Sequence, residues 1–205
     1  MERRTRRQIL DYTHSLCSYD FHKKILSFYR MRIGIVDFSK RTKNNDSLQE
    51  ALQILGHDIF VVHHSDDWYN IVKSSHIKHW IMTGSAYDVF SSKSPQIDTR
   101  IEDLNKKLFL LICYSMESFL LKKGYDLKRR ERTKEAFMLN SNGRHIIAWR
   151  NHNTFISTDS LQSRIRLLAS YKNEIMTASY KNIMMTQWHP ERTNDGIVFL
   201  SKWLS

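Results

Sequence analysis

The sequence predicts an α/β fold in which a mainly parallel central sheet is flanked by helices, with a small region of antiparallel strands in the C-terminal half. Up to about residue 120, short apolar runs alternate with segments whose apolar residues recur at helical spacing, which is typical of a parallel sheet covered on both faces. After residue 130 the apolar runs follow one another closely, which indicates hairpins laid beside the main sheet. The 205 residues, 41% of them hydrophobic, suffice for one well-packed domain of this class.

The first half of the domain is expected to supply most of the parallel sheet. Leu48, Leu52 and Leu55 share one helical face, and Gly56 follows as a residue that ends helices. In chain order the expected elements are a strand at 31–37, the helix before Gly56, strands at 59–62 and 79–82, a helix carrying Ile97, Ile101 and Leu104, a buried strand at 108–112, and a helix from about Met116.

The second half is expected to add short strands and a closing helix. Strand candidates lie at 146–149, 155–156, 167–169, 175–177 and 183–187, and the last helix at 197–204. Residues 1–30 differ in composition, being dense in Arg, Lys, Tyr and His. We therefore divide the chain into a basic N-terminal extension, residues 1–30, and a domain, residues 31–205.

Charge and composition exclude several classes of function. The net charge of +11 raises nucleic acid as a partner, but no zinc-finger spacing, RNA-binding aromatic motif or phosphate loop accompanies it, so nucleic-acid binding is not expected. No apolar run is long enough to span a membrane, and no secretory leader is recognised. Two cysteines, Cys17 and Cys113, favour a reduced, cytoplasmic protein.

Cys113 is the first candidate catalytic residue. It follows the strand at 108–112 directly and precedes a tight turn and a helical pattern, so it stands at an elbow between strand and helix. A helix N-terminus and a nearby imidazole favour the thiolate, which is the nucleophilic form of cysteine. The alternative is a buried cysteine that acts only as a small hydrophobic residue.

Two further segments supply the rest of a catalytic constellation. His189 follows a predicted strand, and Glu191 lies two residues on, where its carboxylate would orient the imidazole as a base for the thiol. Thr83-Gly84-Ser85 ends another buried strand, and its backbone N–H groups, with that of Tyr114, would face a developing oxyanion. Each segment alone is also compatible with ordinary polar surface or a plain turn.

Together these segments resemble the class I, or triad, glutamine amidotransferases. The family elbow G-I-C-x-G-x-Q aligns with 111–117, and its terminal Q-F-H-P-E with 187–191. The oxyanion segment corresponds to 83–85, and 149–153 is similar to the W-x-x-H segment beside bound glutamine in the branch related to GMP synthetase. The resemblance runs from about residue 31 to the C-terminus and implies the amidotransferase-like, flavodoxin-like fold.

The resemblance also implies an activity and its residues. Cys113 would attack the side-chain amide of glutamine, His189 would transfer the proton to ammonia, and Glu191 would orient His189. It implies neither a cofactor nor a metal. The substrate would be glutamine or another γ-glutamyl compound, and a separate synthetase or acceptor subunit would be the partner. Beyond the triad, the residues implied are Ser85 and Tyr114 for the oxyanion hole, and Gly84, Glu117, Asn151, His152 and Asn153 for the substrate.

Three departures from the family pattern keep a second function open. Leu111 and Ser115 stand where the elbow has glycines, and Glu117 replaces a glutamine with a group whose charge would repel the substrate carboxylate. A stand-alone hydrolase that cleaves the glutamine amide or a γ-glutamyl bond is the first hypothesis. A catalytically weakened amidotransferase fold that acts as a binding or regulatory protein is the alternative.

Overall fold

The computed structural model describes residues 30–40, 46–141, 143–161 and 163–205. Apart from Arg30, the predicted N-terminal extension lies outside the described residues, and so does Cys17. The boundary between extension and domain therefore stays a prediction.

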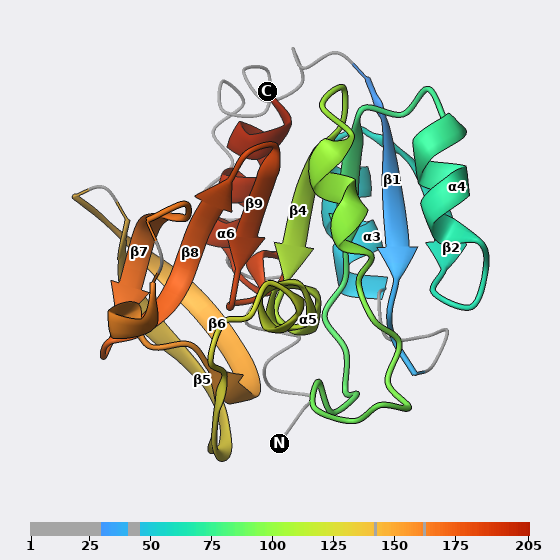
Figure 1. Ribbon diagram of the computed structural model, residues 1–205. Helices are drawn as coiled ribbons and strands as arrows, with labels where there is room; N and C mark the ends of the chain where they lie inside the picture. The colour runs from blue at the N-terminus through green and yellow to red at the C-terminus, as the bar shows by residue number, and fades with distance from the viewer. Residues whose placement is uncertain (1–29, 41–45, 142, 162) are drawn as a thin grey trace, which may run out of the picture.

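The main sheet has seven strands in the order β2-β1-β3-β4-β9-β8-β7 (Figure 1). Its first five members in that order are parallel to one another, whereas β8 runs antiparallel to β9 and β7 antiparallel to β8. This confirms the mainly parallel sheet with antiparallel strands added from the C-terminal half. The strands are β1 (Arg32–Asp37), β2 (Asp58–His63), β3 (His79–Met82), β4 (Leu108–Ile112), β7 (Arg166–Tyr171), β8 (Glu174–Tyr180) and β9 (Ile183–Thr186).

Helices cover both faces of this sheet. Helices α3 (Asp46–Ile54) and α6 (Asn194–Leu204) pack with Leu110 and Ile112 of β4 on one face. Helices α4 (Trp68–Ser74) and α5 (Tyr114–Lys122) pack with Phe109 and Leu111 on the other. Because successive side chains of a strand point to opposite faces, one continuous apolar run serves both cores.

A close contact between β1 and β3 gives the first prediction. A Cβ added to Gly34 would lie 2.3 Å from Cε3 of Trp80, a fully buried ring. Gly34→Ala is therefore expected to lower the free energy of unfolding by about 3 kcal/mol, at the upper end of overpacking costs. Urea denaturation measures the loss. Adding Trp80→Phe to Gly34→Ala should restore part of that loss, because the smaller ring makes room, and a purely additive double variant would contradict the steric explanation.

A separate two-stranded sheet accompanies the main one. Strands β5 (Lys128–Ser141) and β6 (Arg144–Phe155) are antiparallel, with an irregular register between Arg129 and Thr133. Figure 1 shows them beside the β7–β8 end of the main sheet, where Leu139 packs in a cluster with Trp188. The single long β6 replaces the two short strands that the sequence predicts at 146–149 and 155–156.

One predicted helix is wrong. The region of Ile97 and Ile101 forms only a short 3-10 turn, η1 (Thr99–Asp103). The side chain of Asp98 accepts a hydrogen bond from the backbone N–H of Arg100, and Ile97 donates its own N–H to the hydroxyl of Ser118 on α5. The buried isoleucines thus belong to a loop packed on the core rather than to a helical face. Two further 3-10 turns are η2 (Thr158–Ser160) and η3 (Pro190–Arg192). None of the helices in the described residues is long and apolar enough to cross a membrane.

Candidate active site

Cys113 stands at a strained elbow between β4 and α5. Its backbone has φ 50° and ψ −107°, in a region that residues other than glycine seldom occupy. The hydroxyl of Ser115 accepts a hydrogen bond from the Ile112 N–H at 2.8 Å and donates to the carbonyl oxygen of Met82 at 2.7 Å. Ser115 thereby joins the ends of β3 and β4 beneath the elbow. Such strain persists where the surroundings hold it in place, and it gathers at functional sites.

The two larger residues in the elbow motif fit without displacing the turn. Ser115 is fully buried, and the partners of its hydroxyl lie on both strands. Leu111 is also fully buried, and it packs in the core cluster on the α5 side of the sheet. The leucine therefore contributes to the core instead of intruding on the cysteine.

Gly84 brings the nucleophile and the histidine together. A Cβ added to Gly84 would lie 3.4 Å from Cβ of Cys113, 2.9 Å from Cε1 of His189 and 3.7 Å from Nε2 of His189. Gly84 is thus packed against Cβ of Cys113 and the imidazole of His189, and a side chain there would press on the imidazole. The three segments singled out in the sequence meet here because β3, β4 and β9 are adjacent and parallel, and their carboxyl ends lie at one edge.

The imidazole of His189 is held by a carboxylate. Nδ1 of His189 lies 2.8 Å from Oε1 of Glu191, and the His189 N–H donates to the carbonyl oxygen of Trp149 on β6 at 2.7 Å. Burial works to raise the pKa of Glu191, but the imidazole and its hydrogen bond outweigh burial and hold that pKa below its ordinary value. With Nδ1 occupied, Nε2 is the ring nitrogen left on the side of Gly84 and Cys113.

The thiol itself is sheltered. Cys113 is 4% exposed, and burial raises its pKa well above the ordinary value. The neighbouring Glu117 raises the pKa further, whereas a backbone hydrogen bond from Tyr114 opposes both effects. A protonated resting thiol needs a base at the moment of attack, and His189 is the base at hand.

The residues expected to form an oxyanion hole occupy two places. Gly84 and Ser85 line a cavity of about 240 Å³ that also contains His189 and Glu191. The hydroxyl of Ser85 accepts a hydrogen bond from the N–H of Tyr87 at 3.2 Å. Tyr114 lies at the first turn of α5, with its hydroxyl donating to the carbonyl oxygen of Pro95.

The three expected substrate residues of β6 do not share one location. Asn151 lines the cavity beside His189. His152 is buried on the opposite face of the strand, and Asn153 is exposed and does not line the cavity. The alternation of a strand places His152 on the other face from Asn151. Asn153 stands opposite the irregular part of β5.

A buried polar network lies behind the thiol. The side-chain nitrogen of Gln187 lies 2.7 Å from Oε1 of Glu117, 2.6 Å from Nδ1 of His152 and 4.0 Å from Sγ of Cys113. Nε2 of His152 lies 2.6 Å from a terminal nitrogen of Arg130. The family resemblance implies a substrate contact for Glu117 and His152, whereas both side chains meet Gln187 in the interior.

The hydrogen-bond donors around His152 bear on whether Glu117 is protonated. Burial, followed by Arg130 and Arg150, lowers the pKa of His152 to about 3, so its ring is neutral. A neutral imidazole accepts at one nitrogen only, and Arg130 can only donate, so Nδ1 must carry the hydrogen. A half-turn of the Gln187 amide then lets its oxygen accept from Nδ1. That oxygen also faces Glu117, which can donate to it in its protonated form. Burial raises the pKa of Glu117 to about 7, although the hydrogen bond with Gln187 works to lower it.

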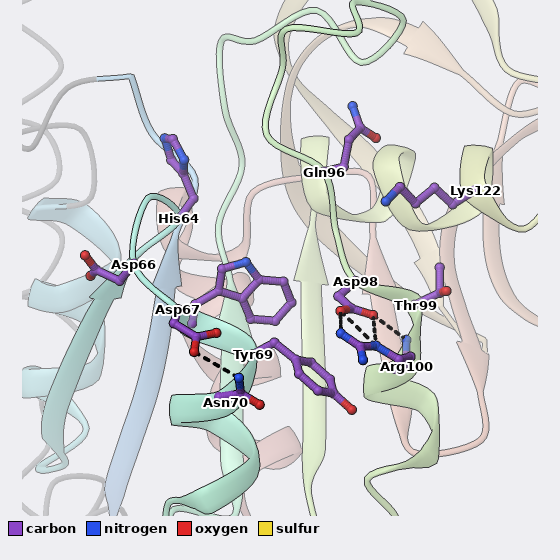
Figure 2. A pocket seen from close by; sticks show the side chains of 11 residues that line it. His64, Asp66, Asp67, Tyr69, Asn70, Gln96, Asp98, Thr99, Arg100 and Lys122 are labelled. Atoms are coloured by element: carbon purple, nitrogen blue, oxygen red, sulfur yellow. Dashed lines mark hydrogen bonds and ion pairs between the residues drawn. The ribbon is translucent and has the colours of Figure 1, made fainter.

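A second cavity, of about 410 Å³, shares no lining residue with the first (Figure 2). Asp67 accepts a hydrogen bond from Asn70 at its rim, and Asp98 is paired with Arg100. Its carboxylates are thus engaged with neighbours. In the described part of the chain, no group of three or more His, Cys, Asp or Glu side chains is arranged to hold a metal ion.

Comparison with known proteins agrees with this architecture. The family described as "Glutamine amidotransferase class-I" matches residues 35–196. A Thermoplasma acidophilum protein, assigned to GMP synthase as one of its subunits, superposes with a TM-score of 0.66 at 19% identity, covering 86% of this chain and 94% of its own. No curated protein sequence matches significantly.

Two structures from Thermotoga maritima share the fold as well. PurLQS superposes with a TM-score of 0.65 at 16% identity, covering 86% of this chain and 100% of the matched one. A glutamine amidotransferase superposes with a TM-score of 0.58 at 11% identity, covering 85% and 84%. At these identities the structural likeness establishes the fold.

Proposed function

The chain belongs to the class I glutamine amidotransferase family, and on that premise we propose that it hydrolyses the side-chain amide of glutamine, or a related γ-glutamyl bond, through Cys113, His189 and Glu191. The observation that carries the proposal is the elbow: a strained Cys113 and a carboxylate-bound His189 meet across Gly84. A cysteine that served only as a small hydrophobic residue would need neither the strained backbone nor the nearby histidine and its carboxylate.

The reaction would proceed in two stages. Nε2 of His189 takes the proton of the thiol as Sγ attacks the amide carbon, and the oxyanion forms near the backbone N–H groups of Ser85 and Tyr114. His189 then gives the proton to the departing ammonia, which leaves a thioester on Cys113. Water, deprotonated by His189, attacks the thioester carbon, and the released thiol regains its proton. Glu191 stabilises the imidazolium formed in each stage.

An ammonia acceptor on another polypeptide is part of the proposal. One of the similar structures is assigned as a subunit of GMP synthase, and another is PurLQS. Both names denote parts of larger synthases. In such an arrangement the chain would supply ammonia to a separate synthetase, and hydrolysis without that partner would be slow.

The second candidate is a weakened amidotransferase fold used for binding or regulation. The observation that favours it is Glu117, whose carboxyl replaces the family glutamine and raises the pKa of the nucleophile when charged. A chain of this kind would bind γ-glutamyl ligands without turning them over. Cys113 would then be slow to react even with an activated ligand.

Covalent labelling separates the two candidates. A glutamine-analogue electrophile, such as a chloroketone, should modify Cys113 within minutes near neutral pH and leave Cys17 largely unmodified, because Cys113 stands at an elbow close to the imidazole of His189. Mass spectrometry of the digested full chain reads the two cysteines separately. Iodoacetamide provides the control for general thiol reactivity. Rapid labelling of Cys17 with an untouched Cys113 would remove Cys113 as the nucleophile.

A further inference from the structure

Arg132 combines three features that the triad does not use: it lines the cavity beside His189, it is fixed there by a neutral partner, and it lies in an irregular part of β5. Nε of Arg132 donates to Oδ1 of Asn151 at 2.8 Å. None of the described carboxylates lies within ion-pairing distance of it. A guanidinium held by an amide keeps its terminal N–H groups for another acceptor.

The strand places Arg132 there through its register. Arg129 pairs with Thr154 and Thr133 with His152, so three residues of β5 stand opposite Asn153 alone. Bulges redirect side chains and are frequent beside active sites. Here Arg130 points inward to Glu174 and His152, whereas Arg132 reaches the cavity.

The charges around the cavity favour an anionic ligand group. Glu191 lines it but is engaged with His189, and Arg192 lies 3.9 Å from that same carboxylate. Glu117 is buried behind the cavity against Gln187 and does not line it. Arg132 is therefore the cation left to meet a ligand, and its charge also favours the thiolate of Cys113.

We propose that Arg132, positioned by Asn151, binds the α-carboxylate of the γ-glutamyl substrate and so selects for a free amino acid or an N-terminal γ-glutamyl group. The inference rests on the proposed function. A planar guanidinium binds a carboxylate through two parallel hydrogen bonds, which fixes orientation as well as charge. The cavity is small, as suits one amino-acid side chain, and its lining includes Gly84 and Ile112, which adjoin Cys113 in space and in sequence.

The test measures binding and turnover separately. In the inert Cys113→Ser chain, calorimetry with L-glutamine should show Arg132→Met weakening the affinity about ten- to a hundredfold, the range expected for a hydrogen-bonded charge. The affinity of Arg132→Lys for L-glutamine should lie between that of the chain with Arg132 and that of Arg132→Met. Lys134→Met, an exposed charge on the same strand, is the matched control and should leave affinity unchanged. L-glutamine α-amide, which lacks the carboxylate charge, should bind weakly to all variants.

The outcomes distinguish the two proposals. Arg132-dependent binding without turnover in the wild-type chain would support the carboxylate site and refute hydrolysis. Turnover with an unchanged KM in Arg132→Met would keep hydrolysis and overturn the site, as would a loss of affinity in Arg192→Met alone. An absence of binding by any γ-glutamyl compound would overturn both.

Discussion

Replacing Cys113 with alanine should reduce γ-glutamyl hydrolysis to background, a loss of about ten-thousandfold or more, because the described residues hold no other thiol that could form the thioester. His189→Ala should cost a similar factor, since the buried thiol has a raised pKa and depends on a base. The measurement is ammonia release from glutamine with purified full-length variants, in the presence and absence of candidate acceptor subunits.

Glu191→Ala provides a graded comparison in the same assay. Its carboxylate acts through His189, so the variant should retain about tenfold or more activity above Cys113→Ala. Thermal unfolding of each variant verifies that the fold is retained. Wild-type activity in Cys113→Ala would show that the measured hydrolysis comes from a contaminating enzyme. Equal losses in all three variants, with intact folds, would contradict an orienting role for Glu191.

The parallel sheet could be predicted because its strands are buried on both faces and therefore read as continuous apolar runs. β4 is the clearest case, with Leu110 and Phe109 in opposite cores. β5 was missed because its first half is charged and pairs only with β6, outside the main sheet. The helix predicted around Ile97 was wrong because isoleucines at helical spacing can also be buried by a loop that packs on the core.

The candidate site also has features that the sequence predicts and features that it does not. The meeting of Cys113, His189 and Gly84 follows from strand ends at one sheet edge, which the order of motifs already indicates. The contact of Glu117 with Gln187 joins the first turn of α5 to the residue that follows β9, and the direction of Arg132 depends on a bulge in β5. Neither is encoded in local spacing, so both required the structure.

Glu117→Gln should make the proposed hydrolysis faster at alkaline pH while leaving its rate nearly unchanged at pH 6. Burial raises the pKa of Glu117 to about 7, so below that pH the residue is neutral and already resembles the glutamine of the family. Above it, the carboxylate raises the pKa of Cys113. Removing a close like charge changes a pKa by about one unit or more, so kcat/KM at pH 8.5 should rise about tenfold or more.

Protonation of Glu117 can also be followed independently through the pH dependence of the free energy of unfolding. The folded chain holds the Glu117 proton more tightly than the unfolded chain, whose glutamate titrates near 4.5. The contribution of Glu117 is therefore largest below pH 4.5 and is lost as the pH rises to about 7, by about 3 kcal/mol. Glu117→Gln removes this slope, because its amide donates to Gln187 at every pH. Glu117→Ala is the control that leaves Gln187 without that donor, and it should destabilise the fold at both ends of the range. A Glu117→Gln to wild-type ratio of kcat/KM that is already about tenfold at pH 6 and stays there at pH 8.5, together with parallel stability curves, would show that Glu117 stays charged throughout and that the half-turn of Gln187 does not occur.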